Sequence, residues 1–579
     1  MRRLLEYMRR YRGRYALGIV CLLATASLAM SVPLLLKHAI DAILADDGLG
    51  QVARLAMAII VIALVQGVAR TYSRALVFNV GRDIETDLRN DLFRKLEDLG
   101  PRFYHEQRTG DLMSRVINDV NAVRMMLGPG ILNLVNTPIY YVYGVGIMLT
   151  LDPRLTIAAL LPYPLILWIV KRFSRRIMEH TLRVQEGLAQ MSSRVQENLS
   201  GLQVVRAYAA EDEQAEAFAE QNRAFRDRSL DLARVRGQLV PVMRTASGLG
   251  TLVVLWYGGS RVIAGYLSIG DLVAFLAYLN LLAWPTMALG WMISVLQRGR
   301  AAMLRLEHVF ATPADIEDAP GAEPLEEVRG RIEFENVDFR YPGREQEQPT
   351  LRNVSLTIEP GEKLALVGRT GSGKSTIASL LTRMFDVSSG AIRIDGRDIR
   401  TLPLAQLRTA VGVVPQDPFL FSTTLDENVR FAARDAGHEA VVAAASAAGI
   451  ADDIEAFPDG YATQVGERGV TLSGGQKQRA TLARAILADP KVIVLDDALS
   501  SVDARTERSI LASLDEVLSR RTSIVITHRI ATIQDADRIA VVEDGRIAEI
   551  GDHRTLLARG GVYAELFRQQ RLEEELATL

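Results

Sequence analysis

The sequence predicts two unlike domains in one chain: an all-α membrane domain of six helices, followed by an α/β domain. The chain has 579 residues, too many for one compact soluble domain. Long apolar runs free of charge alternate with charged stretches in its first half, whereas its second half has the pattern of a soluble α/β protein. We expect a membrane domain with long cytoplasmic loops over residues 1–310, a linker over 311–330 and the α/β domain over 331–579.

Six apolar segments could span a bilayer. Three contain no charge and approach or exceed the roughly 20 residues that a spanning helix needs: Tyr15–Leu36, Met125–Leu151 and Leu272–Gln297. Three are shorter, but flanking arginines and lysines can snorkel to the interface: Leu55–Ala69, Leu155–Val170 and Thr245–Ser260.

Charge in the connections orients these segments. The loops after the second and fourth segments, roughly 75–124 and 171–236, are long and rich in arginine, which predicts that they lie in the cytoplasm. We expect a multi-pass protein of the cell (inner or plasma) membrane, with both termini and the α/β domain in the cytoplasm. The segment Met1–Arg14 carries six arginines and is interpreted as a basic helix on the inner membrane surface.

Composition excludes several classes. The net charge of −2 provides no field that would favour nucleic acid. Cys21 is the only cysteine, so an internal disulfide or a cysteine-rich metal site is impossible. Ala311–Gly330 is acidic and contains three prolines, which is typical of a linker. Turn chemistry interrupts both long loops, at Phe103–Asp111 and Ala207–Glu213, and these turns either transmit motion to the α/β domain or are ordinary connections.

The strongest motif is a phosphate-binding loop between an apolar strand and a helix. Its residues are Gly368, Arg369, Thr370, Gly371, Ser372, Gly373, Lys374 and Ser375, and Thr376 continues the helix. The glycines let backbone N–H groups face the phosphates, Lys374 can reach the β- and γ-phosphates, and Ser375 can hold Mg²⁺. ATP and Mg²⁺ are therefore the predicted ligands.

A second apolar strand, Val492–Leu495, ends in two carboxylates. A carboxylate at the end of such a strand can hold Mg²⁺, which we assign to Asp496. The next residue, Asp497, can orient or deprotonate the attacking water.

Further motifs resemble those of ATP-binding cassette (ABC) proteins. The family signature matches Leu472, Ser473, Gly474, Gly475 and Gln476; the D-loop matches Ser500, Ser501, Val502 and Asp503. Gln416 matches the Q-loop that contributes to the magnesium site, His528 matches the switch histidine, and Tyr341 matches the aromatic residue that stacks on adenine. Six spans followed by one cassette resemble the half-transporters of ABC exporters, the type of bacterial multidrug and lipid exporters.

The resemblance implies a dimer. In that family, each ATP lies between the phosphate loop of one subunit and the signature of the other. Ser473 and its neighbours would therefore serve the ATP of a second ABC half-transporter, and hydrolysis would switch the spans between inward- and outward-facing states.

Asp497 departs from the family pattern, which has glutamate at this position. The shorter side chain retracts the carboxylate by roughly 1.5 Å, and a misplacement of about 1 Å can cost about a hundredfold in rate. The resemblance is thus to the weakly hydrolytic subunit of heterodimeric exporters, paired with a different chain. A homodimer in which Asp497 is active is the alternative.

The substrate is less defined. Amphipathic drug-like or lipid-like molecules are the expectation from the resemblance, and an ATP-gated channel or regulator could use the same modules. Polar or aromatic residues in the spans either line a substrate path or serve the interface and packing: Lys37, His38, Asn133, Asn136, Tyr140, Tyr141, Tyr143, Arg244, Asn280, Trp284 and Trp291.

Overall fold

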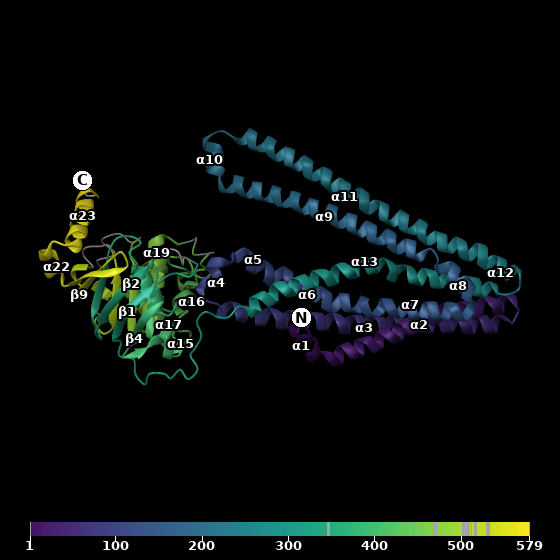
Figure 1. Cartoon of the computed structure of the whole chain (residues 1–579), viewed down its shortest axis with the longest axis horizontal. Helices are drawn as coiled ribbons and strands as arrows, with labels where there is room; N and C mark the ends of the chain where they lie inside the picture. Colours follow the sequence, from purple (N-terminus) through teal and green to yellow (C-terminus); the bar gives the residue numbers. More distant parts are fainter. Residues whose placement is uncertain are drawn as a thin grey trace. The chain divides into compact units, whose positions relative to one another are not determined.

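The computed structural model describes residues 2–343, 348–466, 469, 472–500, 510, 512–514, 518–527 and 533–577. The chain forms two compact units (Figure 1). The first contains the chain up to Leu96 together with Thr109–Thr312, and the second contains Glu97–Arg108 together with Pro313–Leu579. Helix α4 (Pro101–Glu106), from the first predicted cytoplasmic loop, thus belongs to the second unit.

The first unit is helical throughout its described secondary structure. Its long helices are α2 (Arg12–Leu44), α3 (Leu49–Asp98), α7 (Ile131–Leu151), α9 (Tyr163–Ser200), α11 (Glu211–Val253) and α13 (Ile269–Ala311). Its short helices and π-helical turns are α1 (Arg2–Arg10), α5 (Thr109–Ser114), η1 (Arg115–Asp119), α6 (Val120–Met125), η2 (Met126–Gly130), α8 (Pro153–Leu160), α10 (Leu202–Ala207), η3 (Val254–Gly258) and α12 (Gly259–Ile263). In Figure 1, α9 and α11 lie along each other and diverge from α2, α3, α7 and α13.

Four helical stretches in the described part of the chain are long and apolar enough to cross a membrane: Arg12–Leu44, Leu49–Asp98, Thr109–Leu151 and Ile269–Ala311. They contain the first, second, third and sixth predicted spans.

The fourth and fifth predicted spans are also helical, but each is interrupted. Leu155–Val170 is divided between α8 and α9 by a turn at residues 161–162, where Pro162 lacks the N–H that a continuous helix would use. Thr245–Ser260 passes from α11 through the π-helical turn η3 into α12.

The membrane unit is held together by an apolar core and a few polar contacts. Its core joins α2, α7, α8 and α13 through residues such as Met30, Met148, Leu155 and Tyr278, whose hydroxyl donates to the Met30 carbonyl oxygen at 2.7 Å. Lys37 on α2 lies 2.6 Å from Asp271 on α13. Lys37 is therefore an ion-pair partner that fastens two helices.

The second unit contains two β-sheets. The antiparallel sheet has the strand order β2-β1-β4-β5, formed by β1 (Ile332–Phe339), β2 (Leu351–Ile358), β4 (Ser389–Ile394) and β5 (Arg397–Asp398). The larger sheet has the order β10-β9-β3-β8-β7-β6, formed by β3 (Lys363–Val367), β6 (Val411–Val414), β7 (Val492–Asp496), β8 (Thr522–Ile526), β9 (Arg538–Glu543) and β10 (Arg546–Gly551). β9, β3, β8, β7 and β6 are parallel, and β10 is antiparallel to β9.

The helices of the second unit fall into groups with separate cores. Those described besides α4 are α14 (Lys374–Leu381), η4 (Ile399–Thr401), α15 (Leu404–Ala410), α16 (Leu425–Arg430), α17 (His438–Ala447), α18 (Ala451–Glu455), η5 (Gly460–Ala462), α19 (Gly474–Leu487), α22 (His553–Arg559) and α23 (Val562–Ala577). α14 packs into the core between the two sheets, whereas α16, α18 and the start of α19 share a cluster that includes Leu425, Ile454 and Leu472. The α/β fold predicted for this half is confirmed.

Candidate nucleotide site

The site is assembled at one edge of the larger sheet. β3, β8, β7 and β6 are parallel neighbours, so the segments that follow them leave at the same edge, where α/β sheets bind ligands. The phosphate loop follows β3, Asp496 ends β7, and Gln416 follows β6 after one proline. The topology therefore gathers three motifs that are far apart in the sequence. Thr527 follows β8, and the predicted His528 after it lies outside the described residues.

Two glycines of the phosphate loop occupy positions where a side chain would collide. Gly368 has φ +153°, and a Cβ there would lie 2.2 Å from the Val542 carbonyl oxygen. Gly373 has φ +106°, and a Cβ would lie 2.7 Å from a methyl group of Leu351. The loop can thus pass close to the neighbouring strands only with glycine, which keeps its backbone at the sheet edge.

Lys374 lies in the first turn of α14 and is buried, with 7% of its surface exposed. Its ammonium group donates to the carbonyl oxygens of Gly368 at 2.7 Å and Arg369 at 2.9 Å. Burial lowers the pKa of Lys374, and the nearby Asp497 and Asp496 oppose that shift. The lysine is thus a buried cation held inside its own loop, and an anionic phosphate would lower the cost of that burial.

The loop also contains a buried hydroxyl without a hydrogen-bond partner among the described residues. Ser372 Oγ is buried and unpaired, although buried polar groups in proteins are almost always hydrogen-bonded. The exposed Ser375 is the second residue of α14. An anionic ligand seated on the loop would supply the partner that Ser372 lacks.

The donors fit magnesium. Ser375, Asp496 and Gln416 would offer a hydroxyl, a carboxylate and an amide oxygen, and Mg²⁺ bound with a nucleotide typically takes few protein oxygens plus phosphates and waters. No group of three or more acidic, histidine or cysteine side chains suited to a metal occurs in the described part of the chain. A site completed by nucleotide phosphates is consistent with this small set of donors.

Tyr341 is linked to the phosphate-loop helix. Its hydroxyl lies 3.0 Å from Thr376 Oγ1, and its ring meets Phe339 and Phe385 edge-on at centroid distances of 4.9 and 5.4 Å. These contacts fix the orientation of the ring relative to α14. A fixed, half-buried aromatic ring beside the loop is suited to stacking on a base.

Asp496 and Asp497 differ in environment. Asp496 is the buried last residue of β7, whereas Asp497 is half-buried and has a left-handed backbone with φ +45°. The Asp497 N–H donates to the Ile526 carbonyl oxygen at 2.9 Å, which ties the turn to β8. This strained conformation costs roughly 1–3 kcal/mol and is held only because its surroundings fix it.

The signature forms the start of α19. Ser473 is the N-cap: its hydroxyl accepts from the Gln476 N–H at 3.2 Å, and its own N–H donates to Gln476 Oε1 at 3.0 Å. Gln476 Nε2 in turn donates to Asp453 at 2.9 Å. Because a hydroxyl accepts and donates, the Ser473 proton stays available to a further acceptor, and the helix N-terminus adds positive potential.

No hydrogen bond in the described structure joins the signature, Leu472–Gln476, to the phosphate loop. Leu472 is buried in the helical cluster, Ser473 and Gly474 are exposed, and Gly475 is half-buried. The phosphate loop itself has buried residues, Ser372, Gly373 and Lys374, and exposed ones, Arg369, Thr370 and Gly371.

Two residues outside the predicted set organise this region. Gln478 on α19 is buried, and its Nε2 donates to Ser500 Oγ at 2.9 Å. The remaining D-loop residues, Ser501, Val502 and Asp503, lie outside the described part of the chain. Arg484 donates to the carbonyl oxygens of Asn428 and Phe419, and burial lowers its pKa. The only feature of the sequence that could have indicated a role for Arg484 is a positive charge on an otherwise apolar helix face.

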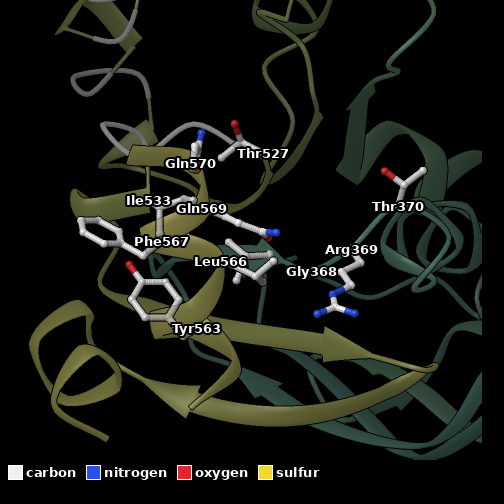
Figure 2. Close-up of a pocket in the computed structure, with 11 residues that line it drawn as sticks. Gly368, Arg369, Thr370, Thr527, Ile533, Tyr563, Leu566, Phe567, Gln569 and Gln570 are labelled. Carbon is white, nitrogen blue, oxygen red and sulfur yellow. The ribbon is translucent and has the colours of Figure 1, made fainter. Parts of the chain in front are cut away.

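A cavity of about 360 Å³ lies beside the loop (Figure 2). Side chains of α23 form one wall, and the start of the phosphate loop forms another. Its lining residues are Val367, Gly368, Arg369, Thr370, Thr527, Ile533, Tyr563, Leu566, Phe567, Gln569 and Gln570. Arg369 reaches within 3.6 Å of Glu565 of the same helix.

The fold and this site define a membrane-bound phosphate-loop ATPase. Residues 15–286 match the family described as ABC transporter transmembrane region, and residues 351–500 match the family described as ABC transporter. The chain is 36% identical to the multidrug resistance-like ATP-binding protein MdlA of Escherichia coli (strain K12), over 98% of this chain and 96% of that protein. It is 34% identical to the ATP-dependent lipid A-core flippase of Syntrophus aciditrophicus (strain SB), over 99% and 95%.

A solved structure has a similar fold over nearly the full length of both chains. It is described as a bacterial Atm1-family ABC exporter with ATP bound, with a TM-score of 0.81, 31% identity, and coverage of 97% of this chain and 98% of that one. The chain belongs to the ABC transporter family and is an ATP-hydrolysing membrane transporter of the exporter type.

Proposed function

We propose that this chain exports amphipathic small molecules, drug-like or lipid-like, as one subunit of a heterodimeric ABC exporter whose own ATP site hydrolyses slowly. The observation that carries the proposal is Asp497, a short carboxylate that stands directly after Asp496 on a turn tied to β8. The substrate class rests on two relatives, one named for multidrug resistance and the other for lipid A-core transport.

The orientation follows from the loops. The arginine-rich connections support a cytoplasmic position for the ATPase unit and both termini, where ATP is available. The inner or plasma membrane is then the location of the helical unit.

The need for a second subunit has two supports. The first is the resemblance to ABC exporters, in which the signature of one subunit donates to the ATP held by the phosphate loop of the other; in the described structure no hydrogen bond joins the two motifs of this chain. The helices α9 and α11 pack along each other and expose apolar side chains such as Leu165, Met178 and Leu182. A second half-transporter would cover part of this apolar surface and supply the missing signature.

Different residues of the chain would bind ATP, hold magnesium and assist hydrolysis. The backbone of the phosphate loop and Lys374 hold the β- and γ-phosphates, and Tyr341 holds the base. Ser375, Asp496 and Gln416 would hold Mg²⁺, which supplies neutralisation of phosphate charge when bound. Asp497 would orient the attacking water and take its proton, while the signature of the partner stabilises the transferred phosphoryl group.

Asp497 would limit the rate of ATP hydrolysis because its side chain is too short to reach the attacking water. Moving a carboxylate back by roughly one bond, about 1.5 Å, takes it out of hydrogen-bond range of a water that glutamate would hold. The site would still bind ATP because Lys374, Ser372 and Tyr341 are intact. It would thus join the two cassettes while the partner's site turns over.

Replacing Asp497 by glutamate tests the proposal. In the purified chain reconstituted alone in lipid, where two copies supply each other's signature, D497E should raise ATPase turnover about tenfold or more, since it restores the reach of the base. D497N should leave most of the turnover of a complex with a glutamate-bearing partner intact. A homodimer with an active Asp497 would give the opposite pattern: no gain in D497E and near-complete loss in D497N.

A further inference from the structure

The membrane unit contains a partly open cavity of about 240 Å³, lined by α2, α3, α7 and α13. Its lining residues are Leu22, Thr25, Gln66, Arg70, Arg74, Leu132, Asn133, Asn136, Tyr140, Asn280, Leu281, Trp284 and Pro285. None of them is acidic. The cavity therefore combines cationic, amide and apolar groups without a negative charge.

Two arginines dominate its charge. Arg70 and Arg74 lie four residues apart on α3, and residues at this spacing are neighbours on one helix face. No described carboxylate lies within ion-pair distance of either one, although arginines elsewhere in this unit, such as Arg261 and Arg305, are paired with aspartates. Like charges at this spacing repel, and an anion bound between them would relieve that repulsion.

The amide groups face the same cavity from other helices. Asn133 and Asn136 come from α7, and Asn280 comes from α13. The Asn133 Nδ2 donates to the Pro129 carbonyl oxygen at 2.9 Å, so this amide is partly committed to its own helix. Asn136 and Asn280 can complete the set of donors around an anion.

The position of the arginines fits a binding role better than anchoring at the membrane surface alone. They directly follow the apolar stretch Leu55–Ala69, where arginine commonly snorkels to the interface. Snorkelling accounts for a cation at this depth, but it does not account for three asparagines and a tyrosine on two other helices around the same space. Arg70 and Arg74 are exposed in this chain and thus open to a ligand, and ionisable groups close to an apolar span usually serve function.

The size of the cavity defines how much of a ligand it takes. Its volume lies below the roughly 300–1,000 Å³ typical of pockets that enclose a drug-sized molecule. Leu22, Leu132, Leu281 and Trp284 give it an apolar side. A charged headgroup fits inside, and an attached apolar chain would continue along that side toward lipid.

We propose that this cavity binds the headgroup of an anionic amphiphile, with Arg70 and Arg74 as the residues that select negative charge. The inference rests on the proposed export function and narrows its substrate class: anionic amphiphiles are accepted, and cationic ones are rejected by the two guanidinium groups.

Binding to the full-length chain in phosphatidylcholine nanodiscs, without nucleotide, tests this. The probes share one alkyl chain: dodecyl phosphate is anionic, dodecylphosphocholine is zwitterionic and dodecyltrimethylammonium is cationic. Tryptophan emission reports binding, and W284F identifies the share of the signal that comes from the cavity. Dodecyl phosphate should bind about tenfold or more tightly than the other two, as one charge-assisted contact would give.

Variants separate charge from packing. R70Q/R74Q should abolish the preference for dodecyl phosphate, R70K/R74K should keep it with weaker affinity, and R54Q on the same helix should behave as the wild type. Equal binding of the three probes, an unchanged preference in R70Q/R74Q, or loss of preference in R70K/R74K would each overturn the proposal. Inorganic phosphate should compete only weakly; competition as strong as that of dodecyl phosphate would overturn the requirement for an amphiphile.

The outcome is distinguishable from failure of the proposed function. Binding is measured without ATP, so a chain that binds dodecyl phosphate selectively but fails to move it into vesicles would contradict export and keep the headgroup site. Transport that discriminates by charge equally in wild type and R70Q/R74Q would keep export and contradict the site.

Discussion

The phosphate loop and the signature, which we propose both serve ATP, are held by different parts of the second unit. The loop follows β3, and its helix α14 packs into the core between the two sheets. The signature opens α19, and Leu472 beside it belongs to the helical cluster with Leu425 and Ile454. The loop and the start of the signature helix are therefore supported by different cores, although the later part of α19 packs on the larger sheet through Leu482, Ala483 and Ala485.

The regions also differ in how they hold a phosphate. Lys374 is a buried cation whose ammonium group donates to carbonyl oxygens of its own loop. Its contribution to phosphate binding would be its positive charge. Ser473 is an exposed cap whose contribution is a hydroxyl and a helix N-terminus. The difference predicts that changes in the loop abolish binding, whereas changes in the signature slow turnover.

The largest effect is expected for K374A. In chains that also carry D497E, removing the buried cation should lower ATP hydrolysis by about a hundredfold or more, because a preorganised donor to the phosphates is lost. Binding of a photoreactive ATP analogue to the same chain should fall with it. K491A, which removes an exposed lysine next to β7, is the matched control and should keep both. Normal binding in K374A would contradict the role of the loop.

S473A is expected to have the next largest effect. It removes a hydrogen bond to a charged group, worth about 1.5–3 kcal/mol, so turnover should fall about tenfold to a hundredfold. ATP binding by the phosphate loop of the same chain should not change. T424A is the matched control, since Thr424 caps α16 with the same reciprocal pair of hydrogen bonds, to Glu427. Both variants lose a cap worth about 1 kcal/mol of stability, and only S473A should lose turnover.

A smaller effect is expected at Tyr341. Loss of the ring in Y341A should weaken ATP binding about fivefold to a hundredfold, as stacking of a base on an aromatic ring is worth about 1–3 kcal/mol. Y341F keeps the ring and loses only the hydrogen bond to Thr376, so it should weaken binding by about tenfold at most, in line with a hydrogen bond worth about 0.5–1.5 kcal/mol. Equilibrium binding of a fluorescent ATP analogue measures both; equal losses in the two variants would assign the effect to the hydroxyl.

The phosphate loop and the carboxylate pair could be predicted because each is a short run directly after an apolar strand. Gly368–Ser375 and Asp496 needed only the strand before them, and the sheet order then placed them at one edge. The left-handed turn at Asp497 was not predictable, since it depends on the hydrogen bond to β8.

Contacts between helices that are far apart in the sequence could not be predicted from the sequence. The sequence showed three asparagines as polar residues in apolar runs: Asn133, Asn136 and Asn280. That they line one cavity with Arg70 and Arg74 depends on how α3, α7 and α13 pack. Arg484 gave almost no signal, because its partners, Asn428 and Phe419, lie more than fifty positions away. The break between α8 and α9 was readable in principle from Pro162, yet the apolar run around it favoured one continuous span.

The most direct test of the central claim, that the two regions serve different ATP molecules, uses mixed dimers of two tagged copies in the D497E background. One dimer carries K374A on one copy and S473A on the other; the second carries both changes on one copy. With sites shared between chains, the first dimer should keep about half of the ATPase rate, because one site retains all its donors, and the second should lose nearly all of it. The reverse pattern would mean that each ATP is bound and hydrolysed within one chain.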